Sequence, residues 1–226
     1  MGERLLVVFV LVATALAALF LLLPLAFLRD VWGQIPYKWN AGVYFASLGL
    51  GFMFIEVCLI QRLTLFLGYP TYSLTVTLFA VLISTGIGSL ASERYATRRN
   101  RAFGVLLASI AALIVFYEWG LPRVVDAGMG WPFGARVAFT IACLLPLGLC
   151  LGAFMPLGLG SVARVTAFGD QYVAWCWAIN GFFSVMASVL ATLLSMTFGF
   201  GTLMLIGLGI YAAGVLAFSR VPVPAE

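Results

Sequence analysis

Long apolar stretches separated by short polar segments are the feature that most constrains this chain. They lie at residues 5–28, 42–67, 73–91, 103–119, 135–159, 173–198 and 202–218. A helix needs roughly 20 residues to cross about 30 Å of hydrocarbon, and these stretches are near that length. Continuous apolar runs favour helices over strands, and lipid cannot satisfy the hydrogen bonds of an open backbone. The sequence therefore predicts an all-α polytopic transmembrane bundle of about seven spans.

Composition supports a chain with almost no soluble part. Hydrophobic residues make up 64% of the 226 residues and charged residues 9%, with a mean hydropathy of +1.13. A soluble domain is nearer half and a quarter. We expect a single transmembrane domain over residues 1–226, in which 5–28 is an additional N-terminal span and 42–218 a six-helix unit. The alternative for 5–28 is a cleaved signal peptide, although the apolar run continues past the small residues at 13–15.

Glycine and proline mark the expected breaks between spans. Gly68, Tyr69 and Pro70 predict a tight turn, and residues 121–134 predict a loop rich in Pro, Gly and Trp. Pro146 and Pro156 are expected to kink the fifth span or to end it early. The reason is that proline lacks the backbone N–H and clashes with the preceding helical turn.

The basic residues are distributed unevenly between the two sides that seven spans would create. The richer side holds Arg29, Lys38, Arg94, Arg98, Arg99, Arg101, Arg164 and Arg220, and the other holds Arg4, Arg62, Arg123 and Arg136. The positive-inside rule assigns the richer side to the cytoplasm. The N-terminus is then outside, the C-terminus is cytoplasmic, and Arg94, Arg98, Arg99 and Arg101 form a basic cytoplasmic loop. If residues 5–28 were removed, both ends would be inside.

Glu56 is a carboxylate with only apolar neighbours from residue 48 to residue 60. An unpaired charge in lipid costs several kcal/mol, so such a residue normally faces protein and has a partner. One interpretation is a structural contact with Arg62, Gln61 or Asn180. The other is a proton- or cation-coupled site in a transporter. Glu56 and Arg62 are six residues apart and lie on different faces of a straight helix, so a direct pair would need a distorted helix.

Small residues at helical spacing predict the faces on which helices pack. Gly49 lies on the same face of the second span as Glu56, and Asn180, Ser184 and Ser188 form a stripe on the sixth span. Helices in a membrane approach most closely where side chains are small. We therefore expect Gly49, Ser184 and Ser188 to lie at helix–helix contacts.

Most kinds of catalytic or metal site have no candidate residues in this sequence. There is no histidine, and none of the four cysteines belongs to a CxxC pair, so we interpret them as small buried apolar residues, the alternative being a disulfide or metal role. No nucleophile–base constellation or phosphate-binding loop is visible, and an enzyme acting on a lipid-soluble substrate would have only Glu56 and Glu118. No basic face stands clear of the bilayer for nucleic acid. We expect no enzyme activity, no cofactor and no metal.

Several segments carry a resemblance to a known family. They are residues 44–56 (YFASLGLGFMFIE), 60–63 (IQRL), 67–70 (LGYP), 72–74 (YSL), 155–158 (MPLG), 177–181 (WAING) and 195–200 (SMTFGF). Together they resemble the membrane part of bacterial spermidine-synthase-like membrane proteins and extend over most of the chain. In that family the helices are joined to a Rossmann-like domain, which this chain lacks, so polyamine synthesis is not implied. The resemblance implies a membrane portion that is detached or forms a separate subunit.

A second resemblance involves residues 88–94 (GSLASER) followed by Arg98 and Arg99. This segment is similar to the cytoplasmic loop motif of major-facilitator transporters, although the expected Asp is replaced by Glu93 or Ser92. The position of the loop after the second span of the 42–218 unit also agrees with that family. The resemblance implies six helices arranged like one transporter half, which would need a second half. The alternative is that these arginines simply enforce topology.

Two functions follow as hypotheses. The favoured one is a non-catalytic integral membrane subunit or domain that anchors or scaffolds a larger complex in the bacterial inner membrane. Its partners would be the lipid bilayer and other membrane subunits or a second copy. The alternative is a secondary transporter, or half of one, that moves a small cation or polyamine with proton coupling. Its intramembrane polar site would comprise Glu56, Gln61, Arg62 and Asn180.

Overall fold

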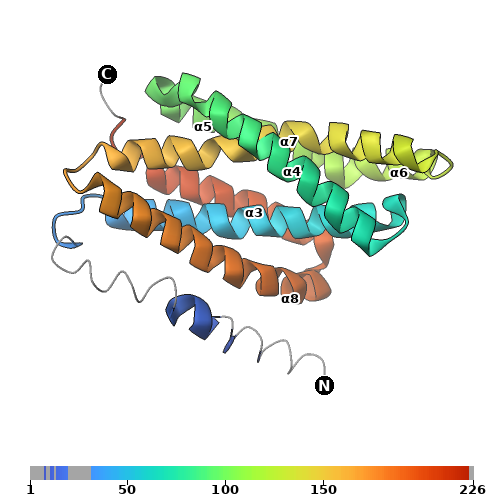
Figure 1. Cartoon of the computed structure of the whole chain (residues 1–226), viewed down its shortest axis with the longest axis horizontal. Helices are drawn as coiled ribbons and strands as arrows, with labels where there is room; N and C mark the ends of the chain where they lie inside the picture. The colour runs from blue at the N-terminus through green and yellow to red at the C-terminus, as the bar shows by residue number, and fades with distance from the viewer. Residues whose placement is uncertain (1–7, 9–10, 13, 20–31, 224–226) are drawn as a thin grey trace.

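The computed structural model describes residues 8, 11–12, 14–19 and 32–223, and the fold is all-α. The helices from residue 32 onward are α3 (Lys38–Leu67), α4 (Pro70–Ser92), α5 (Arg99–Val115), α6 (Leu121–Gly128), α7 (Phe133–Ala163) and α8 (Gly169–Phe218). A 3₁₀-helical segment, Glu93–Arg98, joins α4 to α5, and a π-helical segment, Phe116–Gly120, joins α5 to α6. Figure 1 shows these helices packed side by side along one common direction.

Four stretches of the described chain are long and apolar enough to cross a membrane: Lys38–Leu67, Pro70–Gly128, Phe133–Ala163 and Gly169–Phe218. The prediction of seven separate spans is therefore wrong. Two of these stretches each contain two of the predicted spans: 73–91 and 103–119 lie in Pro70–Gly128, and 173–198 and 202–218 lie in Gly169–Phe218. Most of the span predicted at 5–28 lies outside the described residues.

The backbone of α8 is broken at one residue. Gly199 has φ 80° and ψ 162°, whereas the residues on either side are helical. Only glycine adopts this conformation readily, because any side chain would be strained there. In Figure 1 the two parts of α8, orange before the break and red after it, run in opposite directions. A single glycine therefore separates the two parts of α8 and reverses the direction of the chain.

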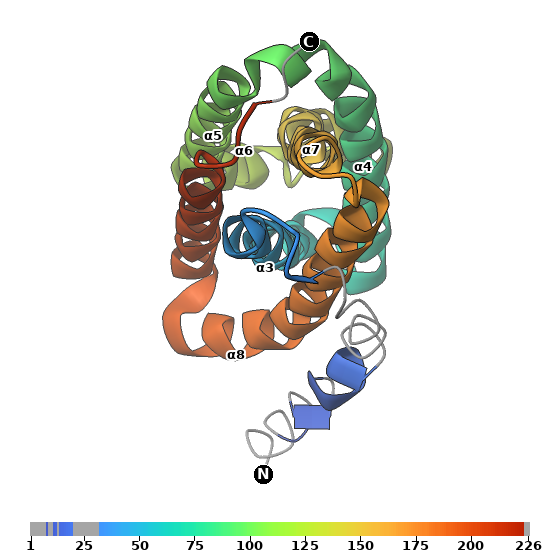
Figure 2. The same ribbon diagram turned by 90° about the vertical axis from the view of Figure 1, so that its left-hand side faces the viewer.

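Helix α3 forms the centre of the bundle. Figure 2 shows it enclosed by α7 and by the two parts of α8. In the most apolar stretch of α3, 61% of the residues are buried, whereas the corresponding share for α8 is 17%. Its largest buried side chains include Tyr44, which stacks on Phe218 with 4.2 Å between ring centroids and donates a hydrogen bond to the Phe154 carbonyl at 2.7 Å. These contacts tie α3 to α7 and α8.

Glycines set the distances between neighbouring helices. A Cβ at Gly88 would lie 2.2 Å from the Leu149 carbonyl oxygen, and one at Gly152 would lie 2.1 Å from that of Thr85. Helices α4 and α7 thus meet backbone to backbone, which is the arrangement that small residues permit in membranes. On α3, a Cβ at Gly51 would lie 2.5 Å from the ring of Tyr211. Larger side chains at these positions would push the helices apart.

Only some of the predicted breaks between helices are present in the structure. Gly68 ends α3 with φ 93° and α4 begins at Pro70, so the turn predicted there is present. The loop predicted at 121–134 is wrong in its first part, which is α6, because Pro122 occupies the first turn, where its missing N–H costs nothing. The expectation that Pro146 or Pro156 ends the fifth span early is also wrong, since both lie inside α7. Neighbouring helices compensate for prolines within membrane helices.

Candidate functional site

A cavity of about 700 Å³ lies between α3, α4, α7 and the two parts of α8. We call it the groove. Its lining is mostly apolar, and the polar side chains in it are Thr85, Ser89, Asn180, Ser184 and Tyr211. Cavities of this size, largely apolar with a few convergent polar groups, are typical of binding sites for small molecules. The groove is therefore the first candidate for a functional site.

Asn180 ties the first part of α8 to α3 beside the groove, and Ser184 lies close to Gly49 of α3. The Asn180 side-chain amide donates to the Phe45 carbonyl at 3.1 Å, and the Ser184 hydroxyl donates to the Asn180 carbonyl at 2.9 Å. A Cβ at Gly49 would lie 2.5 Å from the same Asn180 carbonyl oxygen. The structure thus brings together Gly49, Asn180 and Ser184 at an internal helix contact. Ser188 is not part of this contact, and its hydroxyl donates to the Val185 carbonyl of its own helix in an exposed hydrogen bond.

Tyr211 is a groove residue that sequence reasoning missed. It lies on the second part of α8 and is 2% exposed. Its ring packs 5.2 Å from that of Phe154. Within residues 32–223, its hydroxyl has no hydrogen-bond partner. A tyrosine in the middle of an apolar span was the available signal, because a phenolic hydroxyl in the membrane interior normally finds a partner.

Glu56 is 7% exposed, and no described residue forms a hydrogen bond or ion pair with its carboxylate. It lies one helical turn beyond Phe52, which lines the groove. Gln61 is exposed. Of the predicted polar site of Glu56, Gln61, Arg62 and Asn180, only Asn180 lines the groove.

Arg62 is paired with Glu118, not with Glu56. Its guanidinium forms an ion pair with the Glu118 carboxylate and donates to the Tyr117 carbonyl at 2.8 Å. The two side chains are 18% and 25% exposed, so the pair is half-buried. The π-helical segment presents both Tyr117 and Glu118 to α3, and such segments often occur at functional positions. A Cβ at Gly201 would lie 2.5 Å from Glu118, which places the reversal of α8 against this pair.

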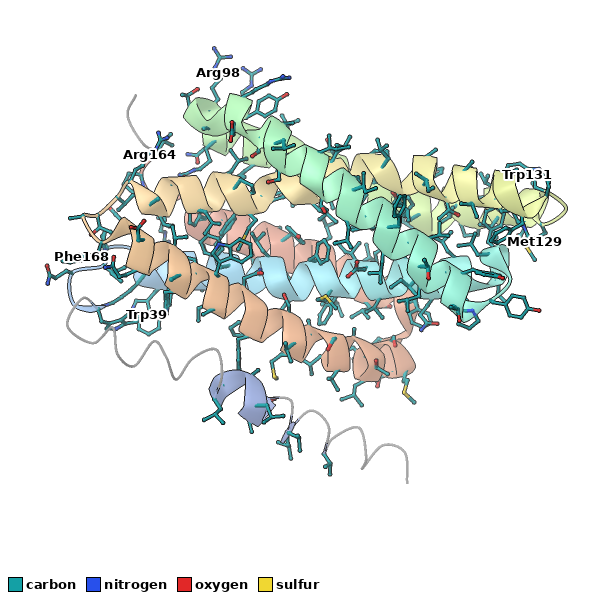
Figure 3. All side chains as sticks on the ribbon, in the orientation of Figure 1. Trp39, Arg98, Met129, Trp131, Arg164 and Phe168 are labelled. Atoms are coloured by element: carbon teal, nitrogen blue, oxygen red, sulfur yellow. The ribbon has the colours of Figure 1, made fainter. Side chains whose placement is uncertain are left out.

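The predicted basic loop is the 3₁₀-helical segment together with the start of α5. Arg94, Arg98 and Arg101 are exposed, whereas Arg99 is fully buried. The Arg99 guanidinium donates to the carbonyls of Val221 at 2.5 Å and Pro222 at 3.1 Å, and lies 5.0 Å from the Phe218 ring. Arg99 thus fixes the segment after α8. Figure 3 shows Arg98 and Arg164 at the same end of the bundle.

Among the described residues, no three His, Cys, Asp or Glu side chains are grouped to hold a metal ion.

No family model, no curated protein and no solved structure matches this chain. The fold and the four apolar stretches define the class: this is an all-α multi-pass membrane protein. Within that class, its particular features are the groove, the Arg62–Glu118 pair and the reversal at Gly199.

Proposed function

We propose that this chain is a non-catalytic membrane subunit that assembles with another membrane protein, or with a second copy, through one face of α8. The observation that carries the proposal is the stripe of Ser188, Thr192 and Ser195 on the first part of α8. Their spacing places them on one helical face, and each hydroxyl bonds to a carbonyl of its own helix. Each side chain is exposed or half-buried.

This face contrasts with the other small-residue faces of the bundle. Gly49 and Ser184 contact each other across α3 and α8, and Gly88, Gly148 and Gly152 lie at the contact of α4 with α7. Small residues offer lipid no advantage over leucine, but they allow another helix to approach closely. Because the hydroxyls are satisfied within α8, the face is stable in lipid before a partner binds. A helix of a partner subunit is the expected occupant.

The mass of the intact particle tests this proposal. Extraction from the native membrane in a mild detergent should yield a particle of fixed stoichiometry heavier than the 24.3 kDa chain. The double variant Ser188→Leu/Thr192→Leu should reduce it to the single-chain mass, because two bulky side chains prevent close approach. Gly209→Leu is the matched control, since a Cβ there meets no atom within 4 Å. A wild-type particle of single-chain mass would refute the proposal.

Proton-coupled transport is the second candidate, and the Glu56 carboxylate favours it. Figure 1 shows that α4 and α5, like the two parts of α8, run in opposite directions, which supports a proposal of six crossings as in a major-facilitator half. A buried carboxylate without a protein partner suits proton exchange. Glu56→Gln should abolish substrate-coupled proton flux in liposomes, measured with a pH-sensitive dye. Flux unchanged by Glu56→Gln, or absent from the wild type, would exclude this candidate.

We further propose that the arginine-rich end of the bundle is cytoplasmic and that the membrane is the bacterial inner membrane. Support comes from the excess of Lys and Arg on that side and from the resemblance of the motifs.

A further inference from the structure

One end of the groove lies beside exposed arginines. Ser89 of α4 and Leu159 of α7 line the groove, and Arg94 and Arg164 each follow five residues later in the sequence. Helical rise places these positions about 7.5 Å apart along the axis. The 3₁₀-helical segment that carries Arg94 and Arg98 packs against α7. The groove therefore reaches nearly to the end of the bundle at which Arg98 and Arg164 are seen in Figure 3.

The charge at this end is positive and unpaired. Arg94, Arg98 and Arg164 are exposed, and none of them forms an ion pair with another described residue. The nearby acidic residues are Glu93 and Asp170, both exposed. Arginine presents a planar fork of donors that matches phosphate oxygens. This end of the bundle is therefore suited to an anion at the membrane surface.

The rest of the groove is suited to hydrocarbon. Along α4 it extends from Leu82 to Ser89, or about 10 Å at helical rise. Its apolar lining includes Trp177, which is 54% exposed, and Gly86, at which a Cβ would meet no atom within 4 Å. The Ser89 hydroxyl, at the end nearest the arginines, has no hydrogen-bond partner among residues 32–223, and neither has the Tyr211 hydroxyl deeper inside.

We propose that the groove binds one anionic phospholipid. Part of an acyl chain lies along α4 and α7, the phosphate lies among Arg94, Arg98 and Arg164, and Ser89 donates to an ester or phosphate oxygen. Basic pockets between membrane helices at the bilayer surface recognise anionic head groups in this way. An apolar groove inside a bilayer is in contact with lipid, and the arginines at one end favour a lipid whose head group is anionic. The inference is independent of the assembly face on α8.

Lipid binding to the purified full chain tests the inference. Detergent-solubilised protein is titrated with dioleoyl phosphatidylglycerol or dioleoyl phosphatidylcholine, and native mass spectrometry counts the lipids that remain bound to each chain. One phosphatidylglycerol should bind more tightly than phosphatidylcholine. Arg94→Gln, Arg98→Gln and Arg164→Gln should each weaken phosphatidylglycerol binding about fivefold and leave phosphatidylcholine unchanged, because each surface arginine contributes about 1 kcal/mol to anionic lipid binding.

A second variant isolates the groove from the charges. A Cβ at Gly86 would meet no atom within 4 Å, so Gly86→Leu should place its side chain in the space of the groove and lower the affinity for both lipids at least tenfold. Gly104→Leu on α5, where a Cβ also has open space, should bind both lipids as the wild type does. Thermal unfolding of both variants establishes that they are folded. Equal binding of the two lipids to the wild type, or wild-type binding by Gly86→Leu, would overturn the inference.

Discussion

Gly152→Leu is expected to leave little folded protein, whereas Gly160→Leu in the same helix is expected to fold as the wild type does. A Cβ at position 152 would lie 2.1 Å from the Thr85 carbonyl oxygen, which is backbone and cannot rotate away. At position 160 a Cβ meets nothing within 4 Å. Overpacking a core typically costs about 1–3 kcal/mol, and separating two helices whose backbones touch should exceed that range.

The yield of monodisperse protein in size-exclusion chromatography, followed by thermal unfolding of the recovered fraction, measures this difference. Both variants add the same side chain to α7, so lipid-facing hydrophobicity does not distinguish them. If Gly152→Leu gave the wild-type yield and unfolding temperature, the close contact between α4 and α7 would be wrong.

The second large effect is expected at the Arg62–Glu118 pair. Arg62→Met alone should lower the free energy of unfolding by about 2 kcal/mol, because Glu118 then loses its charged hydrogen-bond partner at 25% exposure. Glu118→Met should cost at least as much, since it leaves the Arg62 guanidinium without its counter-charge. The double variant Arg62→Met/Glu118→Met should be less destabilised than the sum of the two, because neither charge remains uncompensated.

Chemical unfolding in detergent with all four proteins of this cycle provides the measurement. Arg123→Met serves as the control, since Arg123 is exposed and donates only to the carbonyl of Trp119 on its own turn. It should change stability by less than about 0.5 kcal/mol. Strictly additive effects of Arg62→Met and Glu118→Met would show that the pair does not couple α3 to the π-helical segment.

The parts of this fold that local sequence could predict are those determined by local chemistry. The turn at Gly68 follows from a glycine that accepts positive φ and from Pro70, which is favoured at the start of a helix. The packing of Gly49 against Ser184 follows the helical spacing of small residues. In contrast, Ser188 belongs to the same sequence stripe and yet faces outward. Spacing identifies a face of small residues but not the helix that will cover it.

The missed features depend on residues distant in sequence. Arg62 and Glu118 are separated by 56 positions, and no local pattern predicts that a π-helical segment will present Glu118 to α3. Arg98 and Arg99 are adjacent residues of the same type, but only the Arg99 side chain donates hydrogen bonds to the carbonyls after α8. Tertiary contacts decided each of these cases.

The central position of α3 has a consequence for the order in which the protein matures. Its main contacts are with α8, while α4 pairs with α7, so α3 enters the membrane long before its partner has been synthesised. Until then the Phe45 carbonyl lacks the hydrogen bond that Asn180 of α8 donates to it. Contacts that are so distant in sequence slow folding, because a long chain segment must be ordered before they form. The core of this bundle is therefore completed by one of the later helices to leave the ribosome.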